Sequence, residues 1–182
     1  MGQSPSAGRQ PATRLEGRVF ERFKMDSDAY HRRAQTGPCF ICRIVARDPE
    51  YPAHIIYEDD ETIAFLDKYP ALYGHTLVAP REHREQVTGD FTLEEYLALQ
   101  QRVYRVAEAV RQEVGAERVY LYAFGSNQGN AHVHWLVAPL PPGVPYRQQQ
   151  IAAIRQDPLN IPEEERASLA ARIRRRIEDL SK

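Results

Sequence analysis

Two histidines stand two residues apart in the stretch GNAHVHWLVAPLPPG, residues 129–143. In a β-strand, alternate side chains point to the same face. His132, His134 and Leu136 should therefore share one face. The other face would carry the apolar residues between them: Val133, Trp135 and Val137. A neutral imidazole is both a nucleophile and a metal ligand near neutral pH. The first face therefore predicts a reactive site, and the second predicts core.

The segment before this strand, Gly125 to Asn130, is rich in glycine and amide side chains. Backbone N–H groups and amides in such a loop can bind phosphate oxygens, although an ordinary turn has the same composition. For His132 and His134, the alternative is a strand that buries two satisfied histidines. The combination of loop and histidines favours a phosphate site.

Cys39 and Cys42 are the two cysteines of the chain, which argues against a disulfide scaffold. Their Cys-x-x-Cys spacing suits two ligands of a tetrahedral zinc ion, which needs two further donors. A redox pair or an empty site has the same spacing, but no βαβ unit is predicted around these cysteines. We therefore favour zinc.

Composition limits the class of partner. The net charge of the 182 residues is -1, which gives no electrostatic case for nucleic acid or an anionic membrane as partner. No apolar run approaches the ~20 residues needed to cross a bilayer, and no signal-peptide core is recognisable. We expect a cytoplasmic protein that binds a small molecule. Met1-Gly2 with Ser6 fits the loose myristoylation pattern, but a disordered tail over residues 1–14 is the simpler interpretation.

Hydrophobic periodicity predicts the elements that must position these residues. Residues 15–37 suggest one or two short helices that end before Gly37-Pro38. Thr92 and Glu95 form a capping-box pattern, and apolar residues at helical spacing continue to Gly115, which predicts one long helix. Pro162 opens a last helix. Strands are predicted over residues 54–60, 61–70, 74–80, 117–124 and 131–139.

The order of these motifs resembles the histidine triad (HIT) superfamily of nucleotide hydrolases and transferases. The series is a Cys-x-x-Cys entrance, IIYED, AFLD, GHTLVAPREH, a long helix and a His-x-His strand, over roughly residues 38–143. The resemblance implies an α+β fold in which one long helix packs on a five-stranded antiparallel sheet. The HIT-like domain would span 38–145, with extra helices in the N-terminal extension 15–37 and the C-terminal extension 146–182. It also implies a homodimer across the long helix and the fourth strand.

The resemblance implies catalytic roles for His132, His134 and His75. His134, the middle member of the triad motif, would attack the α-phosphate of a nucleoside phosphate derivative or dinucleoside polyphosphate and form a nucleotidyl-histidine. His75 would lie beside the phosphate. Leu136 stands where hydrolases of the family carry a third histidine, and leucine can neither donate nor accept a hydrogen bond. Because general acid assistance is worth ~10²- to 10⁴-fold, we expect slow or selective turnover.

The resemblance also implies binding residues. Asp67 matches the position that holds the ribose hydroxyls, Ile56 and Leu66 match positions that sandwich the base, and Asn130 would contact phosphate. In zinc-bearing members, the two remaining ligands match His83 and His132. The ligand set of a structural zinc ion would then be Cys39, Cys42, His83 and His132.

Two other functions fit parts of the pattern. Because Leu136 replaces the third histidine, the chain could instead be a nucleotide-binding, zinc-containing interaction protein with weak or no turnover. A His-x-His metalloenzyme of cupin type would use a glutamate together with another histidine downstream of the pair, and this combination is missing from the sequence.

Overall fold

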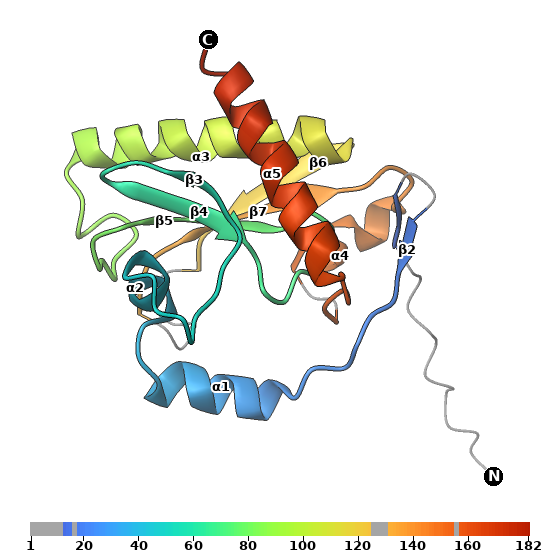
Figure 1. The fold of residues 1–182 in the computed structure, drawn as a ribbon, viewed down its shortest axis with the longest axis horizontal. Coiled ribbons are helices and arrows are strands. Elements are labelled where there is room, and N and C mark those ends of the chain that lie inside the picture. The colour runs from blue at the N-terminus through green and yellow to red at the C-terminus, as the bar shows by residue number, and fades with distance from the viewer. Residues whose placement is uncertain (1–12, 16–17, 125–130, 155–156) are drawn as a thin grey trace.

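A computed structural model describes residues 13–15, 18–124, 131–154 and 157–182. Its centre is a five-stranded antiparallel sheet with the strand order β3-β4-β5-β7-β6 (Figure 1). The predicted fold class, a five-stranded sheet with one long helix and added terminal helices, is confirmed. The strands are β3 Ile55–Glu58, β4 Thr62–Leu66, β5 Thr76–Pro80, β6 Arg118–Tyr122 and β7 Trp135–Leu140.

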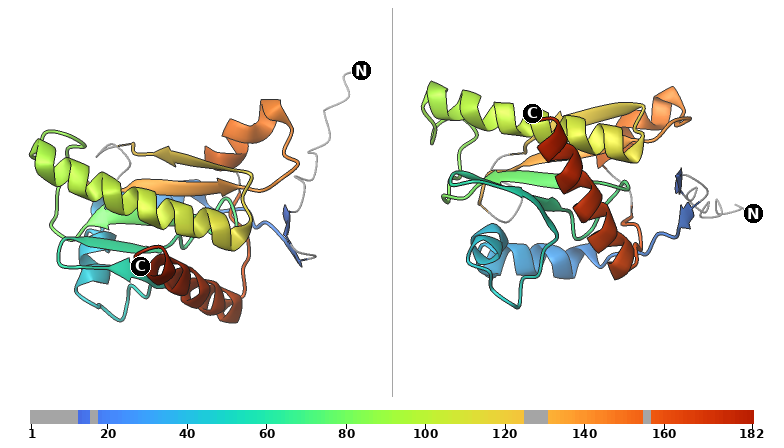
Figure 2. Two further views of the ribbon diagram at one scale, coloured as in Figure 1. Left: turned by 90° about the horizontal axis from the view of Figure 1, so that it is seen from above. Right: turned by 45° about the horizontal axis from the view of Figure 1, so that its top comes forward.

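One face of the sheet is covered by two helices, α3 (Leu93–Val114) and α5 (Glu163–Asp179) (Figures 1 and 2). Thr92 and Glu95 make both hydrogen bonds of the predicted capping box, and α3 ends at Gly115 in the left-handed conformation. The core lies between these helices and the sheet, and it includes Val133, Trp135 and Val137.

The opposite face carries two short helices, α2 (Phe40–Val45) and α4 (Gln149–Ile154). Ile41 and Ile44 of α2 pack on Phe65 and Leu77, while Ala152 and Ala153 of α4 pack beside β7. A 3-10 turn at Tyr146–Gln148 leads into α4. Neither helix follows from the periodicity, because both are only six residues long.

The N-terminal extension differs from its prediction. Residues Thr13–Leu15 (β1) and Arg18–Phe20 (β2) form an antiparallel pair, and the helix α1 covers only Ser27–Thr36. The strand-forming sequence Arg-Val-Phe explains β2, and Phe20 is buried against the ring of Tyr73 with 5.4 Å between ring centroids. The last two residues of the expected tail belong to β1. The rest of the tail, including Met1-Gly2, lies outside the described residues.

The last strand begins at Trp135, four residues later than expected. The ladder between β5 and β7 ends at the pair Val78 and Trp135, although β5 itself continues to Pro80 along β4, so residues 131–134 are not paired in the sheet. The Val133 N–H instead donates to the Arg84 carbonyl at 2.7 Å, outside the sheet. Both histidines of the His-x-His motif therefore lie in the extended segment that enters β7.

Gly74 shapes the turn before β5. Its φ of +84° lies in the region that favours glycine, and a Cβ atom there would lie 2.8 Å from Cγ1 of Val114. The tight turn seats the next residue, His75, against the sheet with 5% of its surface exposed. Within the described part of the chain, no helix has the length and apolar character that crossing a membrane requires.

Candidate active site and metal centre

His134 lies on the face of the sheet that carries α2, and its ring meets Phe40 edge-on with 6.2 Å between centroids. The Nδ1–H of His134 donates to the carbonyl oxygen of His132 at 2.9 Å. This hydrogen bond places the ring hydrogen on Nδ1 and leaves the Nε2 lone pair free. Burial lowers the pKa of His134, so the ring is neutral near pH 7. A neutral imidazole with a free Nε2 is in the form needed for nucleophilic attack.

Asp67 and His75 form a second part of the site. Asp67 follows β4, and its Oδ2 lies 3.1 Å from Nδ1 of His75. Burial alone would raise the pKa of Asp67, but the hydrogen bond and charge of His75 and the Tyr69 N–H outweigh it and lower that pKa. The charge of Asp67 also acts on His134. Asp67 therefore lies beside His75, and its negative charge also acts on the pKa of His134.

Leu136 lies on the same face as His134, as the alternation predicts. In the ladders of β7 it stands opposite Leu77 on one side and Tyr122 on the other. Its side chain is half-buried against the apolar cluster around α2. Leu136 therefore fills its position by apolar packing.

The candidate metal ligands Cys39, Cys42, His83 and His132 converge from α2, from the loop after β5 and from the segment before β7. Their ligand atoms all lie within 4.8 Å of one another. The separations of Nδ1 from Sγ are 3.4 Å for His132 and Cys39, 3.3 Å for His83 and Cys42, and 3.5 Å for His132 and Cys42. In a tetrahedral zinc site, a nitrogen and a sulfur ligand lie roughly 3.6 Å apart. The four donors therefore match the shape and chemistry of a closed zinc site.

The surroundings of these donors also fit a metal. The Nε2–H of His132 donates to the Pro80 carbonyl at 2.9 Å, and Nε2 of His83 lies 3.4 Å from a carboxylate oxygen of Glu85. Metal-binding histidines commonly use their second nitrogen in this way. Burial raises the pKa of Cys39 to about 11, whereas redox-active thiols have lowered pKa values.

Two predicted base contacts lie elsewhere. Ile56 and Leu66 are buried on the opposite face of the sheet, in the core beneath α3 and α5, so the structure does not bring them together with His134. The sequence does not show which face of the sheet Ile56 and Leu66 occupy, because they alternate with the equally apolar Ile55 and Phe65. Phe65 is the residue that packs against Phe40 at the site. Asn130, with the loop from Gly125, lies outside the described residues.

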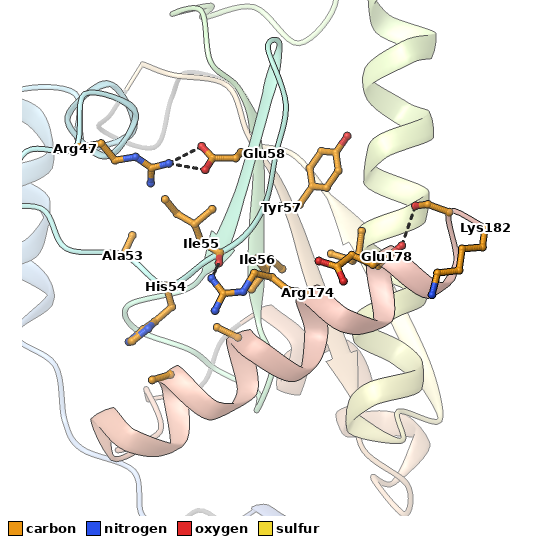
Figure 3. Close-up of a pocket in the computed structure, with 14 residues that line it drawn as sticks. Arg47, Ala53, His54, Ile55, Ile56, Tyr57, Glu58, Arg174, Glu178 and Lys182 are labelled. Atoms are coloured by element: carbon orange, nitrogen blue, oxygen red, sulfur yellow. Dashed lines mark hydrogen bonds and ion pairs between the residues drawn. The ribbon is translucent and has the colours of Figure 1, made fainter.

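A hollow of about 840 Å³ between β3 and α5 is also separate from the histidine site (Figure 3). Ile56 lines it, together with Arg174, whose guanidinium donates to the Ile55 carbonyl at 3.2 Å. The predicted catalytic and metal-binding residues do not line this hollow.

Sequence reasoning missed two residues that contact the site. The Tyr122 hydroxyl lies 3.2 Å from Nε2 of His75, and Phe40 packs against His134. Phe40 lies inside the Cys-x-x-Cys motif, where the two cysteines carry the sequence signal. Tyr122 lies in a predicted strand, but its position opposite Leu136 depends on the register of β6 against β7, which no motif reveals.

Comparison with known proteins gives consistent matches. A family model described as the HIT domain matches residues 48–140. An uncharacterized HIT-like protein of Borreliella burgdorferi is 32% identical over 105 residues, which cover 56% of this chain and 74% of that protein. A bifunctional adenosine 5′-phosphosulfate phosphorylase/adenylylsulfatase of Arabidopsis thaliana is 28% identical over 108 residues, which cover 57% of this chain and 73% of that protein.

Two crystal structures share the fold. A hypothetical histidine triad nucleotide-binding protein from Sulfolobus tokodaii superposes with a TM-score of 0.64 at 28% identity, covering 79% of this chain and 94% of that one. A zinc-bound histidine triad family protein from Mycobacterium smegmatis superposes with a TM-score of 0.62 at 26% identity, covering 79% of this chain and 95% of that one.

The convergence of four donors predicts about one zinc ion per chain in protein purified without chelator. Because a structural metal contributes folding free energy, Cys42→Ala should lose the zinc and lower the thermal midpoint by about 10 °C or more. Metal analysis and thermal unfolding measure both effects, with the exposed His31→Ala as control. Metal-free protein whose thiols titrate freely and whose stability does not rise with added zinc would contradict the prediction.

Proposed function

Because the chain belongs to the HIT family, we propose that it is a nucleotide hydrolase or nucleotidyltransferase that acts at an α-phosphate through a covalent intermediate on His134. The observation that carries this proposal is the hydrogen bond from the His134 Nδ1–H to the His132 carbonyl. It leaves Nε2 of a neutral imidazole as a nucleophile. The names of two relatives support the substrate class, since one is a nucleotide-binding protein and the other acts on adenosine 5′-phosphosulfate.

The proposed reaction has two displacements. Nε2 of His134 forms a bond to the α-phosphorus, and the bond to the leaving group breaks with its electron pair. Water or another acceptor then attacks phosphorus and loses a proton to solvent. The bond from phosphorus to Nε2 breaks with its electron pair on Nε2, which restores the neutral imidazole. Asp67 would accept hydrogen bonds from the ribose hydroxyls, and the neighbouring His75 would lie beside the phosphate. One hard displacement is thus divided into two easier ones.

Zinc has a structural role in this proposal. Cys39, Cys42, His83 and His132 would hold it with no position left for water, and bound zinc would fix the segment that carries the nucleophile. The structure of a zinc-bound member of the family supports this assignment.

Leu136 restricts the leaving group. Its side chain supplies no proton, so a leaving group that departs as a weakly basic anion is favoured over a strongly basic amine. Sulfate, phosphate and pyrophosphate meet this condition. If this restriction is severe for every available substrate, the chain would instead act as a nucleotide-binding, zinc-containing interaction protein, with the same binding residues.

We also propose a homodimer. Leu93, Leu97 and Tyr104 are 74%, 57% and 70% exposed, and their spacing places them on one stripe of α3. Leu121 of the edge strand β6 is 49% exposed on the face of the sheet that α3 covers. An exposed apolar stripe beside a free sheet edge is typical of a surface buried in an oligomer.

His134→Ala should abolish turnover and covalent labelling but leave nucleotide affinity within roughly tenfold, because covalent catalysis needs the imidazole and binding does not depend on it. The measurement is intact-mass analysis after rapid quenching with a panel of adenosine and guanosine derivatives, together with equilibrium binding. His31→Ala is the control. Undiminished activity of His134→Ala would end the mechanism. Tight binding by the unaltered protein without any adduct or turnover would favour the binding-protein alternative.

Leu136→His should restore a proton donor without disturbing the core on the other face of the strand. We expect roughly tenfold or faster turnover of substrates with alkylamine leaving groups, and little change for pyrophosphate or nitrophenol-like groups that depart unprotonated. A series of leaving groups of different basicity measures this dependence. A uniform change across the series would show that residue 136 does not stand in for a proton donor.

Leu97→Glu should convert the proposed dimer into a monomer, because a charge would be placed in the buried stripe. Sedimentation velocity measures the change, and Leu180→Glu at the end of α5 serves as control, since Leu180 lies outside the stripe. Equal effects of the two substitutions, or a monomeric unaltered protein, would contradict the proposed interface.

A further inference from the structure

The connection between β4 and β5 is held by parts of the chain outside the family match. The N–H of Leu159 donates to the carbonyl of Pro70 at 2.8 Å, and the guanidinium of Arg22 donates to the carbonyl of Ala71 at 3.0 Å. Leu159 belongs to the C-terminal extension and Arg22 to the N-terminal one, whereas the HIT model covers residues 48–140. Backbone carbonyls of this connection thus take their donors from both extensions.

Asp67, the first residue of the connection, receives a further contact of this kind. Its carbonyl oxygen accepts a hydrogen bond from the guanidinium of Arg166. Its N–H donates to the carbonyl of His75 at 2.9 Å, and its Oδ1 accepts the N–H of Tyr69 at 2.8 Å. A carboxylate has about four acceptor sites, and 19% of the Asp67 side chain is exposed. The backbone of Asp67 is therefore fixed on both sides while its carboxylate can still accept hydrogen bonds from a ligand.

Arg166 is anchored by the helix that carries it. It lies near the start of α5, and the side of this helix that faces the sheet is buried in the core. The buried residues of that side are Leu169, Ala170, Ile173 and Ile177. A hydrogen bond from a charged donor is also stronger than one between neutral groups. The position of α5 therefore determines where the backbone of Asp67 lies.

The charge of Arg166 is available to Asp67, because the acidic neighbours of Arg166 on α5 pair elsewhere. An oxygen of Glu163 lies 2.9 Å from Nε2 of His54, and Glu165 pairs with another arginine of α5 at 3.2 Å. Burial raises the pKa of the Asp67 carboxyl, and the charge of Arg166 is one of the influences that lower it below its usual value. An ionised carboxylate accepts hydrogen bonds at both oxygens, which is the form that would bind hydroxyl groups.

We propose that Arg166 is a positioning residue that holds Asp67 in place to accept the hydroxyl groups of a ribose, so that the C-terminal extension sets the preference of the site for ribonucleotides. This inference rests on the proposed function, in which Asp67 binds the ribose. An acceptor that is fixed before the ligand arrives costs less ordering on binding. The effect of Arg166 should therefore appear with nucleotides that carry both hydroxyl groups and vanish with nucleotides that lack them.

The test compares Arg166→Met with Arg174→Met in the full-length protein. Methionine keeps an unbranched apolar side chain but removes the charge and the donors. Arg174 is a matched control, because it lies on the same helix and also donates to a backbone carbonyl, that of Ile55 in β3 at 3.2 Å. Titration calorimetry measures the dissociation constants of AMP and GMP and of the 2′,3′-dideoxy analogue of each, and thermal unfolding reports any general loss of structure.

We expect Arg166→Met to weaken the binding of AMP or GMP by about tenfold and that of the dideoxy analogues by no more than about twofold. Arg174→Met should resemble the unaltered protein with every ligand. Arg166→Lys keeps a charged donor and should recover most of the lost affinity. Equal weakening of both kinds of nucleotide by Arg166→Met, equal effects of the two methionine variants, or an unaltered protein that does not prefer the ribonucleotides would overturn the proposal.

Asp67→Ala separates this inference from the proposed function. It should remove the preference for ribonucleotides, and adding Arg166→Met to it should change no affinity by more than about twofold, because Arg166 acts through Asp67. If Asp67→Ala leaves the preference intact, the proposed ribose contact fails together with the inference. If Asp67→Ala removes the preference but Arg166→Met does not reduce it, only the inference fails. The expected affinities without a nucleotidyl adduct would reject the proposed catalysis but support the role of Arg166.

Discussion

Both ring nitrogens of His132 have partners, and the backbone carbonyl of His132 accepts a hydrogen bond. Nε2–H donates to Pro80, Nδ1 lies beside both cysteine sulfurs, and the carbonyl accepts the Nδ1–H of His134. A shift of this one residue would disturb the candidate metal ligands. It would also free His134 to move its hydrogen to Nε2, the nitrogen that we propose as the nucleophile. The tautomer of the proposed nucleophile therefore depends on the same residue as the candidate metal centre.

The two faces of the segment from 132 to 137 have different roles. One face packs in the core, and the other carries the two histidines of the candidate site. Val133, Trp135 and Val137 are 0%, 5% and 0% exposed, and the Trp135 ring meets Phe91 and Tyr96 edge-on beneath α3. Because a close-packed core resists displacement, the opposite face can carry buried imidazoles in fixed positions. Leu136 is an exception on that face, since its side chain joins the apolar cluster around α2 and adds packing where a third imidazole would have added a polar group.

Periodicity and capping were sufficient for the strands and the long helix, because alternation and capping patterns are local in sequence. The spacing of Cys39 and Cys42 indicated two metal ligands, whereas His83 and His132 were implied only by the family resemblance. Periodicity was not sufficient for Ile56 and Leu66. A fully buried strand such as β4 is apolar on both faces, so its sequence does not reveal which side chains point toward the site. The partnership of Tyr122 with His75 depends on strand register and on α4, and neither has a signal in the sequence. The pairing of residues 13–15 with residues 18–20 was not predicted, because charged residues interrupt the alternation that marks a strand.

The N-terminal and C-terminal extensions pair with each other through backbone hydrogen bonds. Phe23 donates to the carbonyl of Pro158, Asn160 donates to that of Glu21, and Leu159 donates to that of Pro70. Phe20 stacks on Tyr73, whose hydroxyl donates to Glu165 of α5. Two segments more than 130 residues apart in sequence thus lie side by side, and each supplies hydrogen-bond partners for the backbone of the other. Removal of either extension would leave the other with exposed donors and acceptors, so the two should open as one cooperative unit. A fragment trimmed to the limits of the family match, residues 48 and 140, would lose the paired backbone groups of both extensions together.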